Sequence, residues 1–180
     1  MMMTRADCLQ RYGSDYYIRQ RIDAGQLHRI EKGIFSDEAH VPALAILAHK
    51  YPKAIVTMQS AFYHYGLTDV IPDVCDLATD RNAAKIPDPR VRQFFMPKGF
   101  FLDGAATEEE RGYPFRIYNR ERMLIELLRY KSKLPFDLYK EILLNYRKIM
   151  RQLDIQKIQD YALAAPKSKK ILDALQMEVL

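Results

Sequence analysis

Two short stretches near the N-terminus carry polar side chains of the kinds that contact nucleic acids. The first is SDYYIRQ, residues 14–20, and the second is HRIEKG, residues 28–33. In the major groove of DNA, arginine can pair with guanine and glutamine with adenine, while basic side chains beside a reading helix suit phosphates. These residue types predict a DNA-binding site at Ser14, Tyr16, Arg19, Gln20, Arg29 and Lys32.

The sequence also allows a simpler interpretation of these two stretches. Tyr16 and Tyr17 could pack in a core, and the arginines could be solvated surface residues. Three carboxylates, Asp15, Asp23 and Glu31, also dilute the positive potential of the region. The residue types therefore favour DNA binding without deciding it.

The elements that must position these residues follow from local signals. Thr4 and Ser14 are N-cap residues that favour helices over 5–11 and 15–24, because a side-chain oxygen can accept from a free amide of the first turn. Gly13 and Gly25 then end the two helices. Within the second helix, Ile18 and Ile22 lie four residues apart on one face.

Two strands are predicted next, over 26–30 and 33–36, around a turn at Glu31-Lys32-Gly33. Helix, turn, helix and a two-stranded ribbon is the order of a winged helix-turn-helix. The module predicted here lacks the further helix that usually precedes this order. We expect residues 1–37 to form this DNA-binding domain and residues 38–180 to form a second domain.

The second domain is predicted to mix helices and short strands. Apolar patterning, N-caps and Pro or Gly breaks mark its elements, and the run Glu108-Glu109-Glu110 is expected to be a solvated loop. The predicted helices span 41–51, 58–66, 119–131, 136–153, 155–165 and 169–177, and the predicted strands span 74–79, 91–97 and 113–119. The fold class is therefore α+β: an N-terminal winged helix-turn-helix, then a mixed α/β domain with a small sheet and a C-terminal helical cluster.

Composition predicts a soluble cytoplasmic protein. Hydrophobic residues make up 48% and charged residues 28% of the 180 residues, which is ordinary for a globular protein. No apolar run approaches the roughly 18 residues of a membrane span, and the N-terminus has no apolar signal segment. Cys8 and Cys75 are far apart and are expected to be small core residues rather than a disulfide pair.

Catalytic and metal-binding patterns are missing from the sequence. The four histidines have no ligand-like spacing with one another or with cysteine. Gly13-Ser14 resembles the start of a nucleotidyltransferase motif, but Asp23 lacks the second carboxylate two places on. After Pro72-Asp73 the acidic-x-Lys tripeptide of a restriction-type nuclease is also missing, and no phosphate-binding or hydrolase glycine motif occurs. We therefore expect no enzyme activity, no bound metal and no cofactor.

The positive charge of the chain is concentrated in its last third. Residues 1–110 contain 13 Lys or Arg and 15 Asp or Glu, whereas residues 111–180 contain 15 and 8. Such an excess suits a polyanion or an acidic protein partner, and it also suits a solvated helical surface.

The motifs in their order resemble one known family. The run GQLHRIEKGIF matches the "G-x-L-x-R" and "G-[IVY]-[YF]" pattern of the N-terminal winged helix of AbiEi-family antitoxins, with Gly25, Leu27, Arg29 and Gly33 at key positions. IVTMQSAFYHYGLTD is similar to the family's "S-x-x-S-A-L-x-x-x-G-L" segment. Later, Asn119, Glu121 and Arg122 match the family's "E-R-T" helix, although Met123 replaces the usual Thr and Glu126 the usual Asp.

This resemblance implies an antitoxin of a type IV toxin–antitoxin system, a class linked to abortive infection and phage defence. Such a protein represses its own operon by binding inverted repeats in promoter DNA through the winged helix. Its C-terminal domain counteracts a nucleotidyltransferase-fold toxin, typically without a stable complex. The alternative is a winged-helix regulator whose second domain senses a ligand or oligomerises. The expected antitoxin surface comprises Arg116, Arg120, Arg147, Lys148 and Arg151.

Overall fold

The computed structural model describes residues 1–179 and has a mixed α+β fold, which confirms the predicted α+β class. That the N-terminal elements form a winged helix-turn-helix stays a prediction. Its contacts divide the chain into two compact units. The N-terminal unit comprises Met1–Tyr51 and Glu109–Phe115, and the second unit comprises Pro52–Glu108 and the chain from Arg116 onward. The functional boundary expected after residue 37 stays a prediction.

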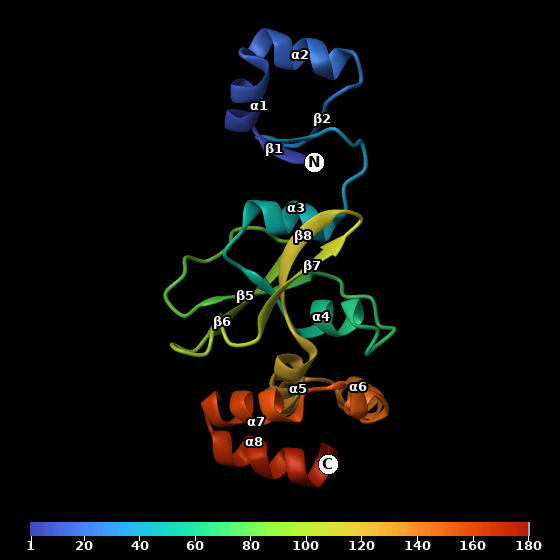
Figure 1. Cartoon of the computed structure of the whole chain (residues 1–180), viewed down its shortest axis with the longest axis vertical. Helices are drawn as coiled ribbons and strands as arrows, with labels where there is room; N and C mark the ends of the chain where they lie inside the picture. The colour runs from blue at the N-terminus through green and yellow to red at the C-terminus, as the bar shows by residue number, and fades with distance from the viewer. Residues whose placement is uncertain (180) are drawn as a thin grey trace. The chain divides into compact units, whose positions relative to one another are not determined.

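Two helices and a three-stranded antiparallel sheet open the N-terminal unit, in blue in Figure 1. The strand order is β1-β3-β2, so β3 lies between its two partners. A later helix, α3, belongs to the same unit. The elements are β1 (Met2–Thr4), α1 (Arg5–Tyr12), α2 (Asp15–Asp23), β2 (His28–Glu31), β3 (Ile34–Ser36) and α3 (Ala43–Lys50).

Local capping bonds begin both helices at the predicted residues. The Thr4 hydroxyl accepts from the Asp7 amide while the Asp7 carboxylate accepts from the Thr4 amide, a reciprocal capping box. Ser14 Oγ accepts from the Tyr17 amide at the start of α2. Between the helices, Gly13 adopts φ 86°, a left-handed conformation that glycine reaches without steric penalty.

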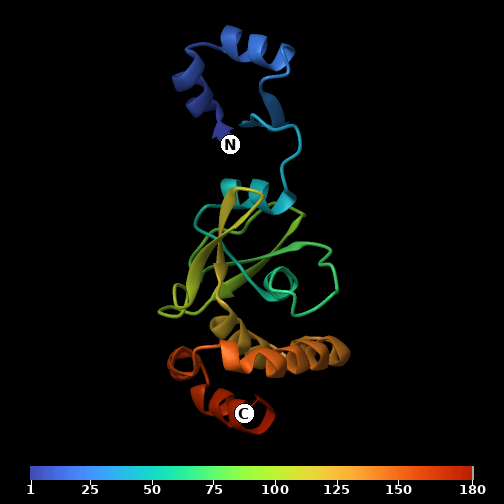
Figure 2. The same cartoon turned by 45° about the vertical axis from the view of Figure 1, so that its right-hand side comes forward.

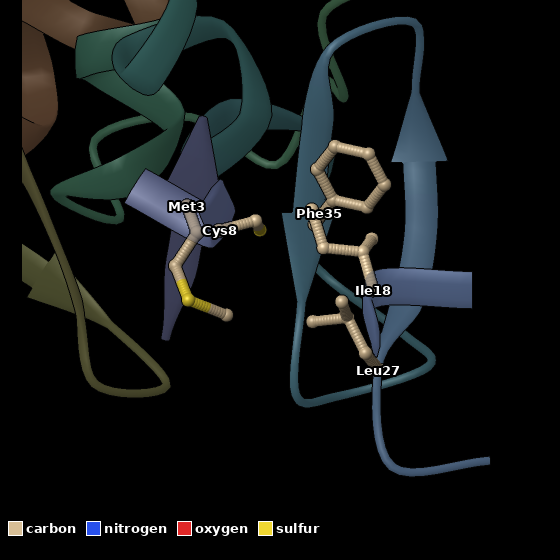
Figure 3. Close-up of a cluster of buried hydrophobic side chains, with 5 residues drawn as sticks. All are labelled: Met3, Cys8, Ile18, Leu27 and Phe35. Carbon is tan, nitrogen blue, oxygen red and sulfur yellow. The ribbon is translucent and has the colours of Figure 1, made fainter. Parts of the chain in front are cut away.

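A small apolar cluster holds this unit together (Figure 3). Met3 from β1 and Cys8 from α1 face side chains that come from α2, the following turn and β3. The five members, all buried, are Met3, Cys8, Ile18, Leu27 and Phe35. Because β1, α1, α2 and β3 each contribute a side chain, the cluster fixes the two helices against the sheet.

The second unit contains the other sheet and most of the helices. Its sheet has the order β6-β5-β4-β8-β7, with β4 antiparallel to β5 but parallel to β8, and β5 parallel to β6. The tip of the β7–β8 hairpin belongs to the N-terminal unit. The strands are β4 (Ile55–Val56), β5 (Cys75–Asp80), β6 (Val91–Met96), β7 (Ala105–Glu110) and β8 (Tyr113–Tyr118).

The helices of the second unit gather around α5, which contacts α4, α6, α7 and α8. Figure 2 shows α5 to α8 together in gold, orange and red. Seven consecutive residues of α5, Arg122–Leu128, are buried, because neighbours cover this helix on every side. The bounds are α4 (Met58–His64), α5 (Arg120–Arg129), α6 (Phe136–Ile149), α7 (Ile155–Ala164) and α8 (Ser168–Ala174).

Several sequence-based expectations differ from the structure. Strands β1, β4 and β7 were not predicted. The run Glu108-Glu109-Glu110 was expected to be a loop, which is wrong, because it forms the end of β7. Thr57 stands at the start of α4 as expected, but its hydroxyl makes no capping bond and instead contacts Met123 Sδ. Cys8 is buried, whereas Cys75 is only partly so.

Candidate nucleic-acid interface

Helix α2 presents polar and aromatic side chains to solvent. Tyr16 is 70% exposed and Tyr17 is 54% exposed, and both Arg19 and Gln20 are exposed as well. The alternative in which the two tyrosines pack in a core is therefore wrong. Tyr16, Arg19 and Gln20 lie three and four residues apart, so they share one face of the helix.

Ser14 has a local structural role. Its Oγ accepts from the Tyr17 amide at 3.5 Å, and the side chain is partly buried. The hydroxyl therefore fixes the start of α2, as expected for an N-cap residue.

Arg29 and Lys32 lie on the β2–β3 hairpin. Arg29 pairs in register with Phe35 of β3, and it is exposed while Phe35 is buried in the apolar cluster. Lys32 is exposed in the turn, next to Gly33, whose φ of 82° needs the freedom of glycine. The hairpin therefore exposes two cations.

Ion pairs neutralise two of the three carboxylates in this region. Arg5 Nη2 lies 2.6 Å from Asp15 Oδ2, and Lys50 Nζ lies 3.2 Å from Glu31 Oε2. The hydrogen bond from Arg5 lowers the pKa of Asp15, and the same bond raises the pKa of Arg5. Asp23 is exposed at the end of α2. Because Asp15 and Glu31 are each paired with a cation, the negative potential around α2 and the β2–β3 hairpin is smaller than the three carboxylates alone would give.

A groove of about 640 Å³ lies beside this surface within the N-terminal unit. Its walls come from the end of α2 at Ile22 and Gly25, from residues 27–30, and from residues 39–41. His28 and His40 line it together with Arg29. Sequence patterns did not bring these two histidines together, because only the chain reversal after β3 places residues 39–41 beside β2.

Four of the five residues expected on the antitoxin surface take part in internal contacts. Arg116 donates to the Lys53 carbonyl at 3.3 Å, and the Arg120 guanidinium lies over the Tyr65 ring at 5.2 Å. Arg147 donates to the Glu178 carbonyl, and Lys148 donates to Asn145 Oδ1 at 2.9 Å. Arg151 is exposed just after α6. Three of these contacts go to carbonyl or amide oxygens and one to an aromatic ring, while the Arg147 charge also helps to lower the pKa of the nearby Glu178.

The structure brings some of these five basic residues close together and leaves others apart. Tyr146 Oη donates to the Arg120 carbonyl at 2.9 Å, so the start of α5 lies beside the last turns of α6, which carry Arg147 and Lys148. Arg116, on β8, is instead bonded to the segment before β4. These contacts therefore group Arg120 with α6 and leave Arg116 apart.

The sequence-based prediction left out two residues of this candidate interface. Arg5 is ten residues from Asp15, a spacing with no helical or strand periodicity, so its pairing follows from the tertiary fold. Tyr17 was considered only as a core residue, although its ring is exposed and contacts that of Tyr16 edge-on at 5.4 Å. The two adjacent tyrosines in the first turn of α2 are the sequence signal that could have pointed to this contact.

No protein-family model matches the chain, and no curated protein matches it. Among residues 1–179, no group of three or more potential metal-ligating side chains is arranged to hold an ion. Across the same residues, no helix has the length and apolar character that a bilayer span requires.

Proposed function

We propose that this protein is an AbiEi-family antitoxin that acts in the cytoplasm. In this proposal residues 1–37 repress the protein's own operon by binding inverted repeats in the promoter. Residues 38–180 counteract a nucleotidyltransferase-fold toxin without forming a stable complex with it.

The observation that carries the DNA-binding part is the exposed face of α2. Tyr16, Arg19 and Gln20 are all exposed on it, and Arg and Gln are the side chains that pair with guanine and adenine in the major groove. The preceding α1 and the following β2–β3 hairpin occur in the order of a winged helix, and β1 adds a third strand to the hairpin. Arg29 and Lys32 on that hairpin suit phosphate contacts.

Charge supports the second part of the proposal. Residues 111–180 carry an excess of seven positive charges. Lys148 near the end of α6 and Arg151 just after it are exposed. A positive surface of this kind favours approach to an anionic partner or an acidic protein. In the proposed function this surface acts in toxin neutralisation.

Two assays on the full chain test the two parts separately. The first measures binding to the protein's own promoter fragment by fluorescence anisotropy. The second measures growth when the chain is co-expressed with the product of the adjacent gene. We expect promoter binding, rescue from growth arrest, and no co-purification of the two proteins.

Two single substitutions at exposed residues separate promoter binding from growth rescue. Arg19→Ala should weaken promoter binding and leave growth rescue unchanged, whereas Arg151→Glu should weaken rescue and leave promoter binding unchanged. Both positions are exposed, so neither substitution removes a buried contact. Absence of promoter binding together with absence of rescue would contradict the whole proposal.

A further inference from the structure

Tyr16 and Tyr17 form an exposed aromatic pair on the first turn of α2. Their ring centroids are 5.4 Å apart and their planes meet at 76°, an edge-to-face contact. Large side chains that stay this exposed in a small folded unit often mark a contact surface, and tyrosine is frequent in such surfaces. The pair does not contribute to the apolar cluster of the unit.

The two rings differ in their neighbours along the helix. Tyr16 shares its face with Arg19 and Gln20, three and four residues on. Tyr17 shares its face with Arg21, which donates to Gln26 Oε1 and lies over the Tyr12 ring at 5.6 Å. Tyr17 is also tied at its backbone, where its amide donates to Ser14. Because the two rings are in contact, the Tyr17 ring occupies space into which the Tyr16 ring would otherwise turn.

The chemistry of the major groove limits what an aromatic edge can recognise there. Base edges display hydrogen-bond donors and acceptors, and the apolar group among them is the 5-methyl of thymine. Gln20, one turn beyond Tyr16, has the amide group that pairs with adenine. An aromatic ring and a glutamine on one helix face suit adjacent A·T pairs.

We propose that Tyr16 selects thymine by contact with its 5-methyl group, and that Tyr17 positions the Tyr16 ring. This inference rests on the proposed function in which α2 enters the major groove. Beyond DNA binding itself, it assigns a preference for thymine and names Tyr16 as the residue that determines this preference.

The test uses the full chain and a random double-stranded DNA library. Duplexes enriched by binding are resynthesised with deoxyuridine in place of thymidine at one position at a time, which removes only the methyl group. We expect at least one position where this change weakens binding about fourfold, the equivalent of about 0.8 kcal/mol for one buried carbon group. This readout needs no protein variant.

Substitutions assign the effect to a residue. Tyr16→Ala should remove the difference between thymine and uracil at that position, and Tyr16→Phe should keep it, because the ring edge remains. Tyr17→Phe should keep the difference while Tyr17→Ala reduces it. Tyr63, an exposed tyrosine on α4, supplies the control, since Tyr63→Ala should change nothing.

The possible outcomes distinguish a failure of the thymine contact from a failure of DNA binding. If no duplex is enriched, DNA binding itself is wrong and the thymine contact falls with it. If duplexes are enriched but no thymine-to-uracil change weakens binding, only the thymine contact is wrong. A difference that persists in Tyr16→Ala would assign the methyl contact to another residue and overturn the inference.

Discussion

Arg122 and Glu126 form an ion pair one turn apart on α5, and neither side chain has any exposed surface. Arg122 Nε lies 2.9 Å from Glu126 Oε1. Arg122 Nη1 also donates to the Phe100 and Asp103 carbonyls, and its guanidinium lies 3.4 Å from the centroid of the Phe100 ring. This arrangement joins the β6–β7 connection to the central helix of the second unit.

Removal of the carboxylate should destabilise this unit strongly. Glu126 accepts from both Arg122 and Arg129, so Glu126→Gln leaves two guanidinium groups without their anion. Breaking a buried pair in this way typically costs about 3–5 kcal/mol. Urea unfolding of the full chain measures the loss. The control is Asp173→Asn on α8, which is exposed and should change stability by less than about 0.5 kcal/mol. A change of similar size in both variants would refute the role of the pair.

Gly104 should tolerate a side chain less well than Gly99. Both residues have positive φ, 77° and 78°, so an alanine is strained at either position by about 1–2 kcal/mol. At Gly104 the added Cβ would also lie 2.4 Å from Arg122 Cβ, whereas nothing lies within 4 Å at Gly99. Gly104→Ala should therefore lose about 1–3 kcal/mol more than Gly99→Ala in the same urea experiment. Equal losses would mean that the loop moves away from Arg122 freely.

The start of α1 should weaken in acid. The hydroxyl and the backbone amide of Thr4 hold the pKa of Asp7 below its ordinary value of 3.8. Because the folded pKa is the lower one, this stabilisation is fully present above pH 3.8 and is lost as the pH falls through the folded value. Amide hydrogen exchange of α1 as a function of pH measures the effect. Asp7→Asn should reduce protection at neutral pH and flatten this dependence; an unchanged profile would contradict the prediction.

If α2 reads bases as proposed, Arg19 and Gln20 should affect DNA affinity differently from Lys32. Arg19→Ala or Gln20→Ala should cost about 1–3 kcal/mol on the preferred sequence and relax the preference for one base. Lys32→Ala should instead weaken binding evenly across sequences and lower the slope of log affinity against log salt by about one. Lys169→Ala, an exposed lysine on α8, is the matched charge control and should have no effect. Equal losses on every sequence for Arg19, Gln20 and Lys32 variants would mean that α2 does not read bases.

Signals within a few residues predicted the helix starts well. Thr4, Ser14, Asn119 and Asp154 each accept from the amide of the residue three places on, at the start of α1, α2, α5 and α7. A bond of this kind depends on neighbouring residues alone, so the sequence reveals it. The hairpin of β2 and β3 followed for the same reason, from a glycine turn between two short apolar segments.

Contacts between residues far apart in the sequence determined the short strands and the exposed face of α2. The strand β1 exists because Met2–Thr4 pairs with β3 some thirty residues later, and the two-residue β4 exists because β5 and β8 flank it. No local pattern carries that information, since a short strand is stable only when its backbone groups find partners elsewhere in the sheet. The exposed face of α2 was favoured but not decided by the sequence, which also allowed Tyr16 to pack inside. The amino-acid order determined where the capped helices α1, α2, α5 and α7 begin. The tertiary structure decided which side chains are left facing solvent, because burial depends on which remote elements cover each face.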